Sequence, residues 1–257
     1  MSDEAGSEEA VLTEQRGRVL VITLNRPEAR NAINGALSHG LWNATNQLND
    51  DPGLTAGVLT GNGKGFCSGM DLKAFSRGED IGPMMEFIKA GAEKPLIGAI
   101  EGFAIAGGLE LALSCDLLVA AKGAKLGIRE VKVGLFAAGG GLIRLPSRVG
   151  YAKAMEMAIT GDNISAEEAF EAGMISEVTE VGGALEAAIA LAERIAKNAP
   201  LAVAASKQMV KAAAQGFDED ELWALQGTLM GKVFGAEDAK EGPRAFAEKR
   251  EPKWTGA

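Results

Sequence analysis

Histidine is almost missing from this sequence, which contains one, His39, among 257 residues. Ser-His-Asp catalysis and histidine-rich metal sites need histidine at the reacting centre, so neither is expected, and we predict no metal site. The sequence has two cysteines, Cys67 and Cys115, without paired spacing or neighbouring histidines. This pattern is typical of buried thiols in a reducing cytoplasm rather than of a disulfide framework or a zinc site.

Positive charge and long apolar runs are also scarce. The 26 Lys and Arg residues are outnumbered by 35 Asp and Glu residues, which leaves a net charge of −9. This balance disfavours nucleic acid or an anionic membrane as the main partner. No apolar stretch reaches the length of a transmembrane helix. Residues 1–10 have neither the basic region nor the apolar core of a signal peptide, so we expect a cytoplasmic protein with a short, disordered acidic lead-in there.

The phosphate-binding glycine motifs are absent as well, although the segment G-N-G-K-G-F-C-S-G-M-D-L-K is rich in glycine. A P-loop places Ser or Thr after its Gly-Lys pair, but Gly65 follows Lys64, and Val58 stands at the earlier glycine position. The dinucleotide fingerprint requires glycine where Phe66 stands. These glycines therefore need another explanation.

The hydrophobic pattern predicts an α/β protein with one core and a helical tail. Short β-branched or apolar runs indicate strands, and a helix capped by Asn34 precedes a break at residues 51–53. After residue 183 every periodic segment is helical, so we divide the chain into a core at 11–182 and a helical extension at 183–257. The predicted strands are residues 11–15, 18–25, 55–60, 97–103 and 117–121; the predicted helices include 109–114, a short one from 141 ended by Pro146, 151–159, 184–197, 201–214 and 218–234.

The chain is organised around residues 97–141, which hold two glycine clusters and two carboxylates in apolar surroundings. Gly107 and Gly108 lie between a predicted strand and helix, where backbone approaches a ligand closely and the first N–H groups of the helix point outward. Glu110 lies in the same turn, and Glu130 follows twenty residues later. Turn chemistry and a carboxylate that complements the helix dipole are the alternative interpretation.

Four separated motifs resemble the enoyl-CoA hydratase/isomerase, or crotonase, superfamily. They are F-C-S-G-M-D-L-K at 66–73, A-G-G-L-E-L-A-L-S-C-D at 106–116, L-G-I-R-E-V-K-V-G-L at 126–135, and the tail E-D-A-K-E-G-P-R-A-F-A-E-K-R-E-P-K-W at 237–254. Their order matches the family from about residue 11 onward. The resemblance implies the crotonase fold, a spiral of ββα turns with a C-terminal helical extension used in trimerisation. The implied assembly is a homotrimer or a dimer of trimers.

The resemblance also assigns chemistry to four residues. In the family, two backbone N–H groups hold the oxygen of a thioester enolate, and here these match Met70 and Gly107. Glu130 matches the acid/base at C2 of the acyl chain, and Glu110 matches the residue that handles water. Having both carboxylates favours an enoyl-CoA hydratase, which adds water across the 2,3-double bond. An isomerase, which needs one carboxylate at the Glu130 position, is the alternative.

Coenzyme A contacts are implied at two loops and at the C-terminus. They match Glu28, Ala29, Arg30, Asp71, Leu72, Lys73 and Lys249. Arg30 and Lys73 are expected to touch phosphate through their side chains, and Glu28 through its backbone. Solvated surface charge is the alternative for each. No cofactor is implied, because coenzyme A is part of the substrate.

The chain departs from typical hydratases after the second carboxylate. The family's I-P-G-A-G-G is replaced by F-A-A-G-G-G at 136–141, which changes the wall beside the acyl chain. The ending A-F-A-E-K-R-x-P-x-W resembles the branch that includes carnitinyl-CoA dehydratase. A substrate other than a straight fatty acyl chain is therefore left open. A non-catalytic acyl-CoA-binding or RNA-binding relative is the competing class, against which both the two carboxylates and the acidic charge count.

Overall fold

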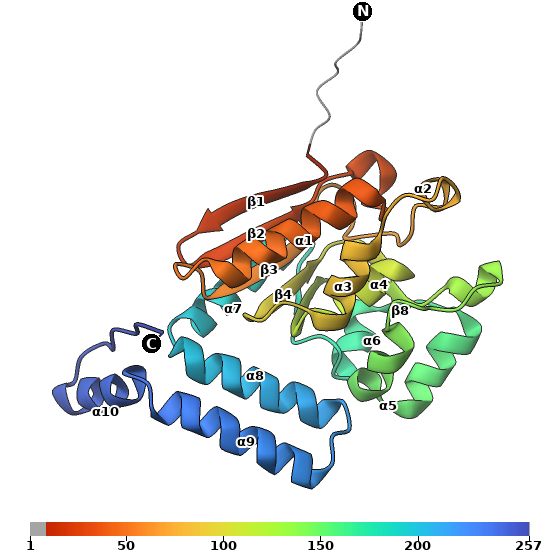
Figure 1. The fold of residues 1–257 in the computed structure, drawn as a ribbon. Helices are drawn as coiled ribbons and strands as arrows, with labels where there is room; N and C mark the ends of the chain where they lie inside the picture. Colours follow the sequence, from red (N-terminus) through yellow and green to blue (C-terminus); the bar gives the residue numbers. More distant parts are fainter. Residues whose placement is uncertain (1–8, 257) are drawn as a thin grey trace, which may run out of the picture.

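A mostly parallel, six-stranded sheet forms the centre of the computed structural model, which describes residues 9–256 (Figure 1). The order is β1-β2-β3-β4-β6-β9, and all neighbours are parallel except β1 and β2. A parallel sheet needs cover on both faces; accordingly β3 and β4 are almost wholly buried. The lead-in at 1–10 lies largely outside the described residues. The strands are β1 (Val11–Arg16), β2 (Val19–Leu24), β3 (Ala56–Gly61), β4 (Leu96–Ile100), β6 (Leu117–Ala121) and β9 (Glu177–Thr179).

The predicted strand at 97–103 is wrong as a single element, because it is divided between two sheets. β4 ends at Ile100, and β5 (Phe103–Ile105) joins β7 (Lys125–Gly127) and β8 (Ile164–Ser165) in a second, three-stranded sheet. Gly102 makes the corner with φ of +57°, and a Cβ there would lie 2.0 Å from the carbonyl oxygen of Lys64. Only glycine fits this corner, which sends the chain from one sheet to the next.

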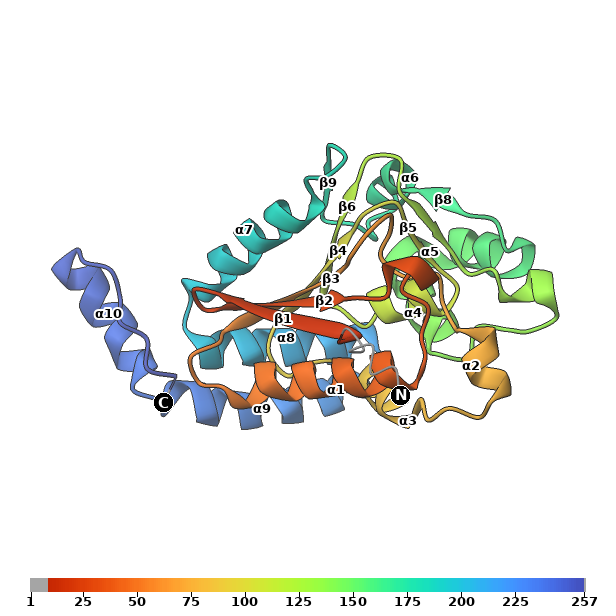
Figure 2. The same ribbon diagram turned by 90° about the horizontal axis from the view of Figure 1, so that it is seen from above.

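Helices cover both faces of the main sheet (Figure 2). α1 (Gly35–Asp50) and α3 (Gly82–Ala90) pack on one face, and α7 (Ala184–Ala196) packs on the other. The predicted cap of α1 is confirmed: Asn34 accepts a hydrogen bond from the N–H of Leu37 at 3.0 Å. Because α7 buries Ala188 and Ala192 against the sheet, the helical part of the chain begins with a helix that completes the core. The boundary predicted at 182/183 stays a prediction.

The helix α5 (Gly141–Thr160) differs from its prediction. It continues through Pro146 and is interrupted at Gly150, whose φ of 75° and ψ of 163° are not helical. Proline removes one hydrogen bond but does not break the helix; the break comes at the glycine four residues later. The remaining helices are α2 (Leu72–Ser76), α4 (Gly107–Ala112), α6 (Ala166–Glu171), α8 (Pro200–Ala214), α9 (Glu219–Phe234) and α10 (Asp238–Glu248), with short 3₁₀ turns η1 (Pro27–Ala29) and η2 (Glu130–Val133). Within residues 9–256, no helix has the length and apolar character that crossing a bilayer requires.

The C-terminal tail is fastened by two buried acids of α10. Glu241 accepts hydrogen bonds from Arg250 at 2.6 Å and from the N–H of Lys253 at 2.8 Å. Asp238 accepts from the N–H of Thr255 at 2.7 Å, and the indole N–H of Trp254 donates to the carbonyl of Lys197 at 2.7 Å. This network explains the acidic, arginine and tryptophan positions of the tail motif.

Glu241 should make docking of the tail resistant to acid. Its hydrogen bonds to Arg250, then to the N–H of Lys253 and to Arg244, hold the pKa of the carboxyl well below its usual range. A lowered folded pKa contributes stability above the unfolded value, which is lost only as the pH falls through the folded value. The tail should therefore stay docked at about pH 4, where an ordinary glutamate is half protonated.

The measurement is ¹⁹F NMR of protein labelled with 5-fluorotryptophan. The Trp254 signal should keep its docked shift at about pH 4, and Glu241→Gln should displace it already at neutral pH, with the exposed Glu237→Gln as control. The Trp42 signal, from a side chain packed against the core, separates release of the tail from global unfolding. A Trp254 transition at the ordinary glutamate pKa would contradict the expectation.

Candidate functional site

Two backbone N–H groups meet where the segment after β3 passes the start of α4. A Cβ added to Gly107 would lie 3.6 Å from the nitrogen of Met70. The N–H of Ile33 donates to the carbonyl of Gly69 at 2.8 Å, and the carbonyl of Ile33 accepts the N–H of Asp71 at 2.9 Å. Ile33 therefore pairs with the residues on either side of Met70 and leaves the N–H of Met70 without a partner among the residues that the structure describes. In the described part of the chain neither Met70 nor Gly107 donates its N–H to a protein acceptor. Two free donors on adjacent backbones can bind one oxygen atom.

The approach of the two segments depends on Gly108. A Cβ there would lie 2.2 Å from the carbonyl oxygen of Cys67, so no other residue fits. The same carbonyl accepts the N–H of Ile105 at 3.1 Å, which fastens the segment to β5. Ala106 precedes the helix with φ of +52° and ψ of −133°, an unusual conformation for a residue with a side chain. Gly107 itself is partly exposed, and a Cβ there would make only ordinary contacts, at 3.6 Å.

Glu110 is a buried carboxyl in the first turn of α4, with 4% of its surface exposed. Its Oε1 accepts the N–H of Gly141 at 2.9 Å. A Cβ on Gly139 would lie 2.6 Å from Oε2, and one on Gly141 would lie 2.9 Å from Cγ. Gly139 and Gly141 thus leave the space, or seat, that the Glu110 carboxyl occupies, and a side chain at either position would have to displace it. Burial raises the pKa of Glu110, while the N–H of Gly141 opposes that rise.

Glu130 begins the 3₁₀ turn η2 and is half-buried. Its Oε2 is buried and has no hydrogen-bond partner within residues 9–256. Burial raises the pKa of Glu130, since an unpaired buried oxygen disfavours the charged form. The charge of Glu130 in turn raises the pKa of Glu110. The two carboxyls interact, and both are suited to exchange protons closer to neutrality than ordinary glutamates.

The loop predicted to contact coenzyme A, residues 28–30, lies against the segment that carries Met70. The carbonyl of Arg30 accepts the N–H of Ser68 at 3.1 Å. Arg30 has φ of +54°. The Glu28 and Arg30 side chains are exposed, and Ala29 is half-buried.

In the second predicted coenzyme A loop, Asp71 has a structural task. Its carboxylate accepts the N–H groups of Lys73 at 3.1 Å and Ala74 at 3.2 Å, and pairs with Arg26 at 3.2 Å. The N–H of Ala74, with Arg26, lowers the pKa of Asp71. The carboxylate caps α2 and is committed there. Leu72, 61% exposed, and Lys73 point into open surface beside it.

Lys249 lies apart from the other predicted site residues. It ends α10 in a left-handed conformation, and Figure 2 shows α10 at the opposite end of the molecule from α2 and α4. One chain therefore brings together the two loops, the free N–H groups and the carboxyls, but not Lys249.

The glycines that seat Glu110 were not among the site residues predicted from the sequence. From the sequence, the triple glycine at 139–141 indicates only a changed pocket wall and the start of a helix. The missed signal is that three consecutive glycines exceed what a helix start needs. Among the residues that the structure describes, no group of His, Cys, Asp and Glu could hold a metal ion.

Comparisons with known proteins agree with this geometry. The family model for enoyl-CoA hydratase/isomerase matches residues 14–257. The chain is 40% identical to the enoyl-CoA hydratase EchA19 of Mycobacterium tuberculosis over 254 residues, 95% of each chain. It is 40% identical to the carnitinyl-CoA dehydratase of Salmonella typhimurium over 255 residues, covering 94% of this chain and 97% of that one. A solved enoyl-CoA hydratase from Mycobacterium tuberculosis superposes with a TM-score of 0.94 at 53% identity, over 97% of this chain and 100% of that one.

The glycine seat should control the protonation of Glu110. In Gly139→Ala the new methyl should push the flexible carboxyl off the N–H of Gly141, because that contact would be 2.6 Å. Loss of a donor that favours the charged form should raise the pKa of Glu110 further. The measurement is a ¹³C NMR titration of the Glu110 carboxyl.

Gly231→Ala, where a Cβ meets nothing within 4 Å, is the matched control and should leave the titration unchanged. An unaltered Glu110 midpoint in correctly folded Gly139→Ala would show that the seat does not hold the carboxyl.

Proposed function

Because the chain belongs to the enoyl-CoA hydratase/isomerase family, we propose that it is an enoyl-CoA hydratase, which adds water across the 2,3-double bond of an acyl-CoA thioester. Its relatives named enoyl-CoA hydratase and carnitinyl-CoA dehydratase support a hydratase function. The observation that carries the proposal is the interaction of the buried Glu110 with the half-buried Glu130, both of which have raised pKa values. A reaction that moves two protons needs two such groups.

The N–H groups of Met70 and Gly107 act as the oxyanion hole in this proposal. They bind the thioester oxygen, on which negative charge develops as the enolate forms. Their free donors and close approach support the role. Gly107 is the first residue of α4, where the helix also favours negative charge. Removal of one such donor typically costs about 10²–10³-fold in rate.

Each of the two carboxyls carries out one of the two proton transfers of hydration. The oxygen of water bonds to C3 while Glu110 accepts a proton from it, and C2 of the enolate takes a proton from Glu130. The N–H of Gly141 favours the charged form of Glu110, as an acceptor requires. The unpaired buried oxygen of Glu130 favours the protonated form, as a donor requires. Proton exchange between the carboxyls and solvent restores the starting state.

The isomerase alternative accounts for less of the site. Moving a proton along the acyl chain of the substrate needs Glu130 and the oxyanion hole. It gives no role to Glu110, which is buried and held by the N–H of Gly141. A non-catalytic acyl-CoA-binding or RNA-binding protein would need neither carboxyl, and the net charge of −9 disfavours RNA. We also propose that no nucleic acid or membrane is a partner and that the enzyme is cytoplasmic, as its two buried free thiols favour.

Coenzyme A is proposed to lie along the two loops beside the oxyanion hole. Arg30 and Lys73 are positioned to meet phosphate, Glu28 and Ala29 offer backbone, and Leu72 offers apolar surface. Asp71 contributes by capping α2 rather than by direct contact. No cofactor is needed beyond the coenzyme A of the substrate, because the chemistry consists of proton transfers and addition of water.

A homotrimer, or a dimer of trimers, is the proposed assembly. The helices after α7 expose more large apolar side chains than an isolated extension is expected to show. Because Lys249 lies far from the site of its own chain, it would serve the site of a neighbouring copy. The exposed side chains include Val210, Phe217, Trp223, Met230, Phe234 and Phe246.

The proposal predicts a gain of water that depends on both carboxyls. A panel of 2-enoyl-CoA thioesters, straight, branched and steroid-derived, should include members that gain the mass of water. Glu110→Gln and Glu130→Gln should each reduce turnover by about 10²–10⁴-fold, the usual contribution of a general acid or base. Binding of the CoA ester should stay nearly unchanged, because neither carboxyl contacts the CoA moiety in this scheme.

Mass spectrometry with stopped-flow absorbance measures turnover, and the exposed Glu86→Gln serves as control. Full activity of Glu110→Gln would contradict hydration by two carboxyls and favour the isomerase. If no thioester in the panel gained water, the hydratase proposal would be wrong.

Gly107→Ala separates an oxyanion donor from a turn residue. The added methyl meets nothing closer than 3.6 Å, so the fold should be retained. It would lie beside the N–H of Met70, where the thioester oxygen is proposed to bind. Turnover should fall on the order of 10²-fold, with a melting temperature close to wild type.

The second readout is the absorbance of a bound chromophoric enoyl-CoA. Polarisation of its carbonyl should produce a red shift in wild type that shrinks in Gly107→Ala at equal occupancy. Gly227→Ala, also with no neighbour within 4 Å, should behave as wild type. An unshifted spectrum in saturated wild type would leave Met70 and Gly107 as ordinary backbone.

A further inference from the structure

A cavity of about 550 Å³ lies at the end of α4 opposite to Gly107. The segment after α4, the first half of α5 and one side of α8 line it. Four lining residues are cationic, Arg144, Arg148, Lys207 and Lys211, and Asp116 is the acid among them. The mechanism proposed above uses none of these residues.

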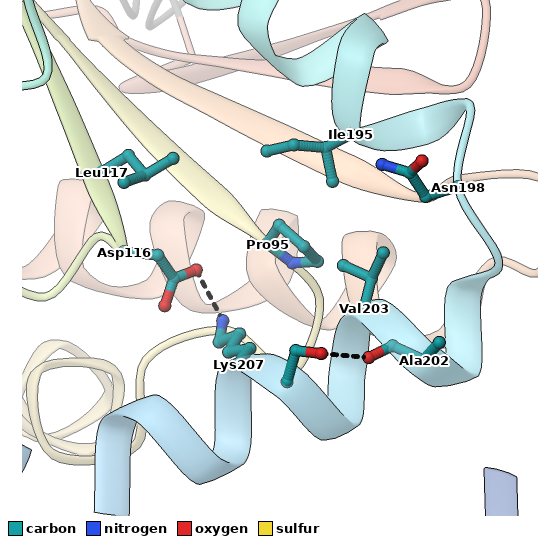
Figure 3. A pocket seen from close by; sticks show the side chains of 9 residues that line it. Pro95, Asp116, Leu117, Ile195, Asn198, Ala202, Val203 and Lys207 are labelled. Atoms are coloured by element: carbon teal, nitrogen blue, oxygen red, sulfur yellow. Dashed lines mark hydrogen bonds and ion pairs between the residues drawn. The ribbon is translucent and has the colours of Figure 1, made fainter. Parts of the chain in front are cut away.

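The two cations on α8 are fixed by backbone carbonyls. Lys207 donates to the carbonyls of Ala92 at 2.7 Å and Lys94 at 2.9 Å, and pairs with Asp116 at 2.7 Å. Figure 3 shows this ion pair at the edge of an adjoining pocket. Lys211 donates to the carbonyl of Ala90 at 2.6 Å. The three donors of Lys207 are used, whereas Lys211 has donors to spare.

The two cations on α5 are fixed in the same way. Arg148 donates to the carbonyls of Cys115 at 3.0 Å and Asp116 at 3.1 Å, and Arg144 donates to the carbonyl of Ile88. These carbonyls follow or end α3 and α4, whose C-terminal ends favour positive charge. The partial negative charge at these helix ends therefore explains part of the positive charge around the cavity.

The partial negative charge of the helix ends is too small to neutralise the four cations. Each helix end is equivalent to about half a negative charge, and the Asp116 carboxylate is already paired with Lys207. Burial lowers the pKa of Arg144, and the charge of Arg148 adds to this, while the charge of Glu110 opposes it. Burial and the charges of Lys207 and Arg144 lower the pKa of Lys211. The charge of Asp116 opposes this lowering. Four interacting cations thus surround one space in a chain whose net charge is −9.

We propose that this cavity binds a small anion carrying phosphate groups. Phosphate oxygens are the acceptors that arginine and lysine recognise best. A phosphate seated against Lys211, Arg148 and Arg144 would supply the negative charge that the helix ends do not. α4 separates this cavity from the oxyanion hole, since its six residues span about 9 Å. Among the lining residues, the charge of Arg144 also acts on Glu110, so the variant that tests the site is made at Lys211, which the proposed hydratase chemistry does not use.

The test is calorimetric titration of the full-length protein with sodium pyrophosphate at constant ionic strength. Wild type should show saturable binding of about one anion per chain. Lys211→Met should weaken it at least about tenfold, the effect of one charge-assisted hydrogen bond, and Lys211→Arg should largely restore it. Lys122→Met, a lysine 62% exposed and outside the cavity, should bind as wild type does. Lys211 is chosen because, unlike Lys207, its loss leaves no carboxylate unpaired.

Separate titrations with inorganic phosphate and with coenzyme A distinguish the source of the phosphate. Tight binding of inorganic phosphate or pyrophosphate that is sensitive to Lys211→Met and unaffected by saturating coenzyme A identifies a free anion. Competition by coenzyme A that is also sensitive to Lys211→Met assigns the phosphates to a second coenzyme A molecule.

Two results would overturn the proposal. One is the absence of saturable binding in the assembled protein, as expected if acidic side chains of a neighbouring copy fill the cavity. The other is pyrophosphate binding that is lost in Arg30→Met but intact in Lys211→Met, which would place the anion at the loops proposed for coenzyme A. Hydration activity is not part of either readout, so failure here leaves the proposed function untouched.

Discussion

The close contact between Gly108 and the carbonyl of Cys67 is the constraint on which the site depends. A Cβ at this point would lie 2.2 Å from that oxygen, so the start of α4 can approach the segment at 66–70 only through glycine. This approach brings the N–H groups of Met70 and Gly107 together. The corner at Gly102 is a second such constraint, because it directs β5 into the small sheet that supports both segments.

Burial then determines the behaviour of the two carboxyls. Glu110 and Glu130 have raised pKa values for the same reason, removal from water, but their neighbours differ. Glu110 accepts an N–H from Gly141, whereas Oε2 of Glu130 has no partner in the described part of the chain. Both carboxyls therefore bind a proton more readily than ordinary glutamates do, and their different neighbours suit the different roles proposed for them.

The short helix α4 has a different electrostatic task at each end. Its N-terminal end presents free N–H groups and suits developing negative charge, while the carbonyls beyond its C-terminal end hold Arg148. The cations around the cavity beyond α4 donate to carbonyl groups at and after the C-terminal ends of α3 and α4, which would otherwise be unpaired. Their excess over the neighbouring negative charge is what distinguishes a site for an anion from ordinary helix capping.

The sequence by itself determined the family, the alternation of strands and helices, and the cap at Asn34, because motifs and periodicity are local properties. It also singled out Gly107, Glu110 and Glu130 as candidates. Only the tertiary structure decided that 97–103 divides at Gly102, that Gly139 and Gly141 seat Glu110, and that Lys249 lies far from the site of its own chain. Each of these depends on which distant atoms come into contact, and spacing along the chain carries no record of such contacts.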